Sequence, residues 1–129
     1  MVDRTGIEQA YERLWQALIS ENLAGLEMVL SENLAIGWPA ETSDLPADRE
    51  LLKEAVRGGK LRVFSYMTES MSMVPADLSG DDSVDFVGRS RVTFAVRGEK
   101  RRNSGVMIRS RLSRGRYGWQ FLSARISLY

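Results

Sequence analysis

The chemistry open to this sequence is limited first by two residue types that it lacks. It contains neither His nor Cys, which excludes Ser–His and Cys–His nucleophilic pairs, disulfides and thiolate ligands. Only carboxylates and carbonyls would remain as metal ligands, and we expect no metal and no cofactor. The sequence also has no phosphate-binding glycine loop and no dinucleotide fingerprint. Carboxylates, tyrosines and arginines are therefore the candidates for chemistry.

Glu69 is the carboxylate with the pattern expected of a general base. It alternates with Met67, Met71 and Met73, and burial among apolar residues would raise the pKa of its carboxyl. The alternative is a solvated carboxylate at a sheet edge, or one paired with an arginine. Tyr66 falls on the opposite face of a regular strand, so it cannot converge with Glu69 on one substrate. Catalytic residues therefore stay unassigned.

Helices are predicted in the first half of the chain. Thr5 and Glu8 form a capping box ahead of an amphipathic helix of about four turns. Asn22 is predicted to cap a short second helix. Residues 48–57 have the pattern of a third helix, which Gly58-Gly59 would end.

From Leu61 onward the hydrophobic period changes from 3.6 to 2, which is typical of strands. A short extended segment and four long strands are expected at residues 33–37, 61–74, 84–97, 101–114 and 119–128. Loops or turns are expected at residues 40–47, 75–83, 98–99 and 115–118. Helices followed by consecutive strands predict an α+β fold, with about three helices packed on one face of an antiparallel sheet. We expect residues 1–129 to form one domain.

Two short turns fix the predicted register of the last three strands. Two-residue turns at Gly98-Glu99 and Gly115-Arg116 would place Arg109 opposite Gly88 and Leu122. The predicted inner face then holds Val84, Phe86, Gly88, Ser90, Val92, Phe94, Met107, Arg109, Arg111, Gln120, Leu122, Ala124 and Ile126. The predicted opposite face holds Val87, Arg89, Arg91, Val106, Ile108, Leu112, Trp119, Phe121, Ser123 and Arg125.

The predicted inner face mixes apolar residues with polar groups that tolerate burial, as a ligand cavity does. Small residues such as Gly88 would leave room for a ligand. The candidate ligand-binding residues are Arg109, Arg111, Ser90, Gln120, Met107 and, near the mouth where the chain turns, Trp38. The Arg109 guanidinium would bind a carboxylate or phosphate bidentately. The alternative for Arg109 is an internal salt bridge with a helix carboxylate.

The predicted opposite face has aromatic residues that are typical of interface anchors. We expect a protein interface there, made by Trp119, Phe121, Ile108 and Val106.

The order of these elements and several local motifs resemble the nuclear transport factor 2-like superfamily, especially its SnoaL-like small domains and the association domain of calcium/calmodulin-dependent protein kinase. The matching segments run from Trp15 to Leu23, Gly59 to Leu61, Asp81 to Val84 and Gly118 to Leu122. The resemblance implies a cone-shaped fold whose curved sheet and helices, packed on its concave face, enclose a pocket. It further implies a homodimer through the outer sheet face, and a pocket arginine at the strand position of Arg109.

Departures from that family weaken an enzymatic interpretation. Many relatives have an acidic residue where this chain has Asn22, and often a His where it has Ile36-Gly37-Trp38. Relatives that act as isomerases or dehydratases use Asp, Tyr or His inside the cone, and no Tyr–Asp pair can be transferred to this chain.

The formal net charge is +1, but the charges are unevenly distributed. Residues 1–85 carry 7 basic and 16 acidic side chains, whereas residues 86–129 carry 11 basic and 1 acidic. The basic part could bind nucleic acid or another polyanion. The alternative is that acidic helices fold back against a basic sheet. The strands lack the interleaved exposed aromatics of single-strand platforms, so nucleic acid is not an expected partner.

We therefore expect a homodimer with an arginine-containing pocket for a small acidic or mixed apolar ligand. A cofactor-independent isomerase, cyclase or dehydratase that uses carboxylate and tyrosine is the second hypothesis. An association or polyanion-binding module is the third. No apolar run is long enough to span a bilayer, so we expect no membrane partner, and the lack of Cys fits a cytoplasmic location.

Overall fold

The computed structural model describes residues 3–39, 45–75 and 83–129, and the parts of the predicted loops at 40–44 and 76–82 lie outside this range. The elements are α1 (Arg4–Ser20), α2 (Leu23–Val29), β1 (Leu30–Gly37), α3 (Arg49–Arg57), β2 (Leu61–Pro75), β3 (Ser83–Val96), β4 (Arg102–Gly115) and β5 (Gly118–Leu128). The predicted α+β class is confirmed.

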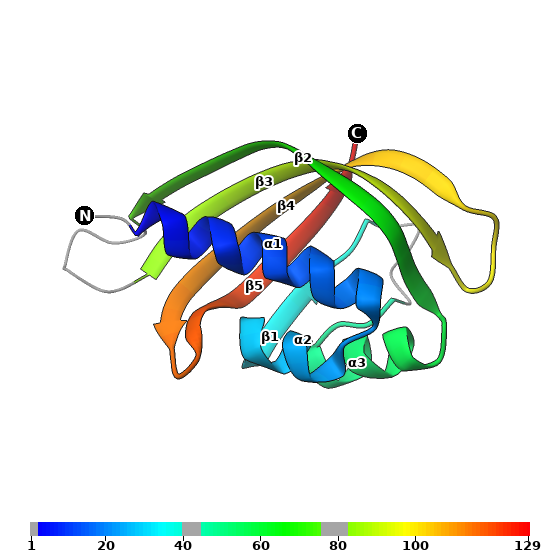
Figure 1. Cartoon of the computed structure of the whole chain (residues 1–129), viewed down its shortest axis with the longest axis horizontal. Coiled ribbons are helices and arrows are strands. Elements are labelled where there is room, and N and C mark those ends of the chain that lie inside the picture. Colours follow the sequence, from blue (N-terminus) through cyan, green and yellow to red (C-terminus); the bar gives the residue numbers. More distant parts are fainter. Residues whose placement is uncertain (1–2, 40–44, 76–82) are drawn as a thin grey trace.

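The strands form one curved sheet in the order β1-β5-β4-β3-β2. The four long strands are antiparallel to their neighbours, and β1 runs parallel to β5 at one edge. Figure 1 shows all three helices on the same side of the sheet, with α1 lying along the long strands and α2 and α3 beside β1. The helices therefore cover the concave face, as predicted.

Helix α1 begins differently from the prediction. Its N-cap is Asp3, whose carboxylate accepts a hydrogen bond from the Gly6 amide at 3.1 Å, so the predicted Thr5–Glu8 capping box is wrong. The same carboxylate accepts from the Trp119 indole N–H at 3.0 Å. That bond is the main cause that lowers the pKa of Asp3. One side chain thus caps α1 and ties it to β5.

Asn22 caps α2 as predicted, because its side chain accepts from the Gly25 amide at 3.0 Å. Asp48 caps α3 in the same way, through the Leu51 amide at 2.9 Å. Helix α3 is followed by Gly59 in the left-handed region, at φ +76°.

The turn between β3 and β4 lies one residue earlier than predicted. Arg97 and Gly98 both have positive φ values, 53° and 74°, as the two central residues of a type I′ turn require, and the Glu99 amide bonds to the Val96 carbonyl at 2.9 Å. The predicted turn at Gly98-Glu99 is wrong. That turn alone would pair Gly88 with Met107, but the β3–β4 ladder is offset by one further residue, so Gly88 pairs with Ile108 and not with Arg109.

The turn between β4 and β5 also differs from the prediction. Gly115 pairs with Gly118, so the central turn residues are Arg116 and Tyr117 rather than Gly115 and Arg116. A bulge next to Leu112 then shifts the register along the rest of β5. The odd offset of the β3–β4 ladder exchanges the predicted faces of β4 and of the first part of β5, and the bulge restores the predicted faces beyond it.

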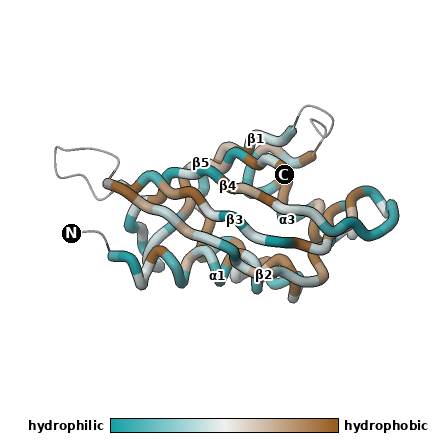
Figure 2. Tube along the Cα trace, turned by 90° about the horizontal axis from the view of Figure 1, so that it is seen from above, coloured by the Kyte–Doolittle hydropathy of each residue, from teal (hydrophilic) through white to brown (hydrophobic). Residues whose placement is uncertain are grey.

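We call the helix-covered side of the sheet the inner face and the opposite side the outer face. The predicted faces are right for β3 and for Ala124 and Ile126, but wrong for Met107, Arg109, Arg111, Gln120 and Leu122. The inner positions of β4 and β5 include Arg102, Val106, Ile108, Ser110, Leu112, Trp119, Phe121, Ala124, Ile126 and Leu128. Polar and apolar residues alternate along the strands in Figure 2.

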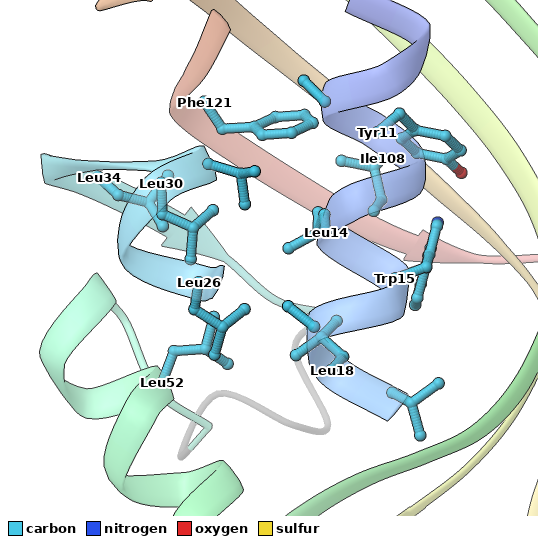
Figure 3. Close-up of a cluster of buried hydrophobic side chains, with 14 of the residues drawn as sticks. Tyr11, Leu14, Trp15, Leu18, Leu26, Leu30, Leu34, Leu52, Ile108 and Phe121 are labelled. Carbon is cyan, nitrogen blue, oxygen red and sulfur yellow. The ribbon is translucent and has the colours of Figure 1, made fainter. Parts of the chain in front are cut away.

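The predicted interface residues belong to the hydrophobic core. Val106, Ile108, Trp119 and Phe121 are at most 8% exposed, and Figure 3 shows Ile108 and Phe121 among side chains of α1, α2 and α3. A partner cannot contact these four residues while the fold is intact. The interface predicted from them is therefore wrong, and its cause is the register error.

Candidate functional site

A cavity of about 110 Å³ lies between the inner face of the sheet and the helices. Its deep end is formed by buried residues that include Leu14 and Trp15 of α1 and Phe121 of β5 (Figure 3). An apolar cavity of about 150 Å³ can stay dry and accept a benzene-sized molecule. The space here therefore suits one ring or a short aliphatic chain.

The cavity wall contains residues of different exposure. Its half-buried residues include Ile36 of β1, Trp38 just after β1, Phe94 of β3 and Leu128 of β5. Arg102, the first residue of β4, is the exposed residue of the described lining. We infer that the cavity opens to solvent at Arg102.

Arg102 supplies the charge at this mouth. Of the described residues that line the cavity, it alone is ionisable. It lies opposite Phe94 in the ladder, with its guanidinium carbon 5.7 Å from the centroid of the Phe94 ring. This cation–π contact holds the aliphatic stem against the wall and leaves the guanidinium hydrogen-bond donors available. The sequence prediction missed Arg102 because the predicted β3–β4 register is offset by one residue from the observed one, which turns Arg102 to the other face.

Trp38 is the one predicted ligand-binding residue that lines this cavity in the described part of the chain. Its indole N–H donates to the Pro46 carbonyl at 2.5 Å. Close by, the Ile36 amide donates to the Ala47 carbonyl at 2.8 Å. The segment ahead of α3 thereby fixes the orientation of the Trp38 ring in the cavity wall.

Ser90 has a different role from the predicted one. Its hydroxyl lies 2.6 Å from the Tyr11 hydroxyl, and both residues are fully buried. Burial raises the pKa of Tyr11, and the hydrogen bond with Ser90 partly offsets this. A Cβ on Gly88 would lie 2.6 Å from the Tyr11 ring. The space left by these small residues is thus filled by Tyr11 and not by a ligand.

A carboxylate and a tyrosine do meet near the cavity, between α1 and β2. The Tyr66 hydroxyl donates to Glu12, and the Thr68 hydroxyl donates to the same carboxylate at 3.0 Å. Burial first, and then the bond to Glu12, raises the pKa of Tyr66. Trp15 stacks on the Tyr66 ring at 5.8 Å between centroids. Since Trp15 lines the cavity and Tyr66 and Glu12 do not, this pair acts as a tie between α1 and β2.

The pairing of Glu12 with Tyr66 could not have been found in the sequence. The two residues lie 54 positions apart, and neither belongs to a motif. The only local signal is the helical spacing that puts Glu12 on α1 next to buried Tyr11.

The other predicted ligand-binding residues lie away from the cavity. Arg109 is exposed on the outer face, and Arg111 pairs with Asp85 there, with 3.2 Å between Nε and Oδ1. Met107 is half-buried on that face as well. The Gln120 amide donates to the Met28 carbonyl at 3.2 Å. The predicted position of Arg109 inside the cone is wrong, and so is the salt bridge with a helix carboxylate as its alternative.

Glu69 lies on the outer side of β2, where a bulge interrupts the alternation with its methionine neighbours. It accepts a hydrogen bond from the Tyr129 hydroxyl. The Tyr129 ring covers Gly105, since a Cβ there would lie 2.4 Å from the ring. Glu69 therefore faces the C-terminal residue and not the cavity.

Within residues 3–39, 45–75 and 83–129, no group of carboxylates is arranged to hold a metal ion. No helix in that part of the chain is long and apolar enough to cross a membrane.

No family model matches the sequence, and no curated protein matches it. Solved structures do. A nuclear transport factor 2-like protein from Rhodospirillum rubrum, described as of unknown function in nutrient uptake, is 22% identical, with a TM-score of 0.80 over 95% of this chain and 98% of that one. A nuclear transport factor 2-like protein from Cytophaga hutchinsonii is 14% identical, with a TM-score of 0.83 over 100% of both chains.

A third similar structure is a putative calcium/calmodulin-dependent kinase II association domain from Exiguobacterium sibiricum. It is 12% identical, with a TM-score of 0.77 over 100% of this chain and 95% of that one. The three structures share with this chain a whole architecture at low identity. The chain therefore has the nuclear transport factor 2-like fold.

Proposed function

We propose that this protein binds a small molecule with an apolar body and an anionic end. The apolar body occupies the cavity between the sheet and α1, and the anionic end meets Arg102 at the mouth. The observation that carries this proposal is an apolar cavity with a single ionisable residue among its described lining, placed at its exposed end.

The chemistry of the wall favours binding over catalysis. The described lining contains no carboxylate, hydroxyl or amide side chain, so it offers no general base. The Trp15 indole N–H is buried without a hydrogen-bond partner among the described residues, but its ring meets that of Tyr11 edge-on at 6.1 Å. A carboxylate such as a short fatty acid or benzoate needs only what is present: apolar surface and a guanidinium.

The test uses isothermal titration with butanoate, hexanoate and octanoate, with hexanol and hexylamine as uncharged and cationic analogues. Affinity should rise about fourfold per methylene, following about 0.8 kcal/mol for each buried CH₂, until the cavity is full. Hexanoate should bind more tightly than hexanol, and hexylamine most weakly. Equal affinity for all three six-carbon probes, or no rise with chain length, would contradict the proposal.

Matched variants separate the two parts of the site. Arg102→Gln should weaken hexanoate by about threefold to tenfold, because it removes a charged donor at an exposed rim, and should leave hexanol unchanged. Arg101→Gln is the control, since its guanidinium packs over Phe64 at 3.8 Å and is not part of the lining. Ala124→Leu adds volume to the wall and should weaken both probes.

Self-association is a second proposal. It is supported by the likeness to a putative association domain, and the structure assigns no interface to it. Sizing by light scattering tests it, and a monomer at working concentrations would exclude it. The single-domain organisation and the cytoplasmic location also remain predictions.

A further inference from the structure

The outer face of the sheet carries a second concave region, on the side away from the cavity. It is an open hollow of about 870 Å³ where β4 and β5 approach the β1 edge. Its charged residues are Arg109 and Arg111 of β4, Arg125 of β5 and Asp85 of β3. The sequence prediction assigned Arg109 and Arg111 to the inner cavity, so the structure leaves these arginines without an assigned role.

The register brings two of these arginines directly together. Arg109 and Arg125 are paired residues on neighbouring antiparallel strands, and like charges at such positions are unfavourable. Gly37 of β1 is the next residue in the same row. A Cβ at Gly37 would lie only 3.9 Å from Cγ of Arg125, so the Arg125 side chain extends over the backbone of the edge strand.

The described residues compensate only part of the positive charge of the hollow. Asp85 is bound to Arg111, with 3.2 Å between Oδ1 and Nε. Among the residues that the structure describes, no ion pair is formed by Arg109 or Arg125. Within residues 3–39, 45–75 and 83–129, three guanidinium groups and one carboxylate line the hollow, which leaves two positive charges uncompensated among these residues. An unfavourable arrangement of this kind, inside a concave surface, indicates that an anion belongs there.

We propose that this hollow binds a small dianion, a phosphate monoester or a dicarboxylate, through Arg109 and Arg125. Two planar guanidinium forks on adjacent strands can each offer paired donors to one phosphate or to the two ends of a dicarboxylate. The charge of a dianion matches the two uncompensated arginines. A second copy packed on this face would place arginine against arginine in an isologous contact, which makes it the less suitable occupant.

This inference does not rest on the function proposed for the cavity. The two sites lie on opposite faces of β4, and Arg102 is not among the residues of the hollow. The two linings share Ile36 and Ala124, but substitutions of Arg102 on one side and of Arg109 or Arg125 on the other leave both shared residues unchanged.

The experiment is a titration of the full chain with inorganic phosphate and with succinate near pH 7.5, at ionic strength held constant with sodium chloride. Binding is followed by calorimetry and by the shift of the unfolding temperature, which rises when a ligand binds only the folded state. Arg109→Gln and Arg125→Gln are the test variants. Arg116→Gln, at the β4–β5 turn outside the hollow, is the control with the same loss of charge.

The expected result is that phosphate or succinate stabilises the wild type and Arg116→Gln alike, and binds each test variant about tenfold or more weakly. Which of the two anions binds more tightly identifies the ligand class. Without added anion, Arg125→Gln should unfold at the same temperature as the wild type or a higher one, because the like-charge pair is gone. That second readout shows that lost binding is not lost folding.

Three outcomes would overturn the proposal. The first is the absence of binding of either dianion by the wild type at constant ionic strength. The second is equal affinity in Arg109→Gln, Arg125→Gln and Arg116→Gln. The third is that phosphate and succinate do not bind, while Arg109 and Arg125 are instead required for another interaction. That interaction would be a salt-sensitive dimer or the binding of a DNA duplex.

Discussion

Strand β4 presents two chemically different surfaces on its two sides. Its inner residues Val106 and Ile108 are at most 5% exposed and contribute to the wall of the apolar cavity. Its outer residues Arg109 and Arg111 line an open, positively charged hollow. Arg102, at the start of the same strand, stands at the cavity mouth. A single strand thus supplies the candidate contacts for two ligands of different chemistry.

The comparison shows that the position of an arginine relative to the sheet, more than its presence, decides what it can do. On the inner face a charged residue is tolerated only at the rim, because burial without a partner is costly. On the outer face water screens the charges, so unpaired arginines can remain adjacent.

The largest effect is expected from a charge placed in the core. Trp119→Glu removes a side chain that is 8% exposed and puts a second carboxylate beside Asp3, which accepts the Trp119 indole N–H. We expect a loss of about 3 kcal/mol or more in the free energy of unfolding, measured by urea denaturation.

Arg125→Glu on the outer face is the matched substitution. It replaces a like-charge pair by an opposite-charge pair with Arg109, so the free energy of unfolding should change by no more than about 0.5 kcal/mol or rise slightly. A folded Trp119→Glu protein of wild-type stability would place Trp119 on the surface and reverse the assignment of the faces.

A smaller loss in the free energy of unfolding is expected from a substitution where α1 packs on the inner face. Gly88→Ala adds a Cβ 2.6 Å from the Tyr11 ring, and overpacking of this kind costs about 1–3 kcal/mol. Gly37→Ala adds a Cβ whose nearest neighbour is 3.9 Å away, which is ordinary contact. Its stability should be unchanged, and thermal unfolding of the two variants compares them. Equal stability of both would show that Tyr11 does not fill the space over Gly88.

The boundaries of the elements could be predicted because they depend on local signals: the hydrophobic period, the cap at Asn22 and the glycines after α3. The faces of β4 and β5 could not be predicted from the sequence, because one extra residue in a turn or bulge is enough to exchange them. Arg97 adopts φ 53°, a conformation that sequence reasoning assigns to glycine first, and this moved the predicted turn by one residue. Moving a two-residue turn by one position keeps the faces, but the ladder is offset by one further residue, and with period 2 that odd offset exchanged Arg109 for Ile108 at the inner face.

The cavity could be predicted as a feature of the fold but not in its details. Its one lining arginine depends on the register of Phe94 with Arg102. The bonds of Tyr11 to Ser90 and of Tyr66 to Glu12 join residues 79 and 54 positions apart. Such contacts arise from the packing of α1 on the sheet, which leaves no pattern in the sequence.

The smallest effect is expected on the pH dependence of stability. It concerns two tyrosines, one on each face of the sheet. The pKa of Tyr11 is raised above its ordinary value of 10.0 mainly by burial, and the pKa of Tyr129 is raised mainly by its hydrogen bond to Glu69. Because both are higher in the folded state, both stabilise the fold fully below pH 10, and this stabilisation is lost as the pH rises through the folded pKa. Tyr11→Phe and Tyr129→Phe should each reduce the loss of stability above that pH.

Salt should distinguish the two tyrosines. The interaction of exposed Tyr129 with the Glu69 carboxylate is screened by 1 M sodium chloride, so the pKa of Tyr129 should fall. The effect of burial on the pKa of Tyr11 is not screened. Ultraviolet titrations of the wild type and the two variants at low and high salt show how far salt lowers the pKa of each tyrosine. A Tyr11 pKa that falls with salt as much as that of Tyr129 would show that Tyr11 is accessible to solvent.

The most direct measurement is a crystal structure with 6-bromohexanoate, in which the anomalous signal of bromine locates the apolar end of the probe. We expect bromine beside Leu14, Trp15 and Phe121, with the carboxylate within hydrogen-bond distance of Arg102. Bromine in solvent with the carboxylate held by Arg109 and Arg125, or no bound probe at concentrations that saturate the titration, would contradict it.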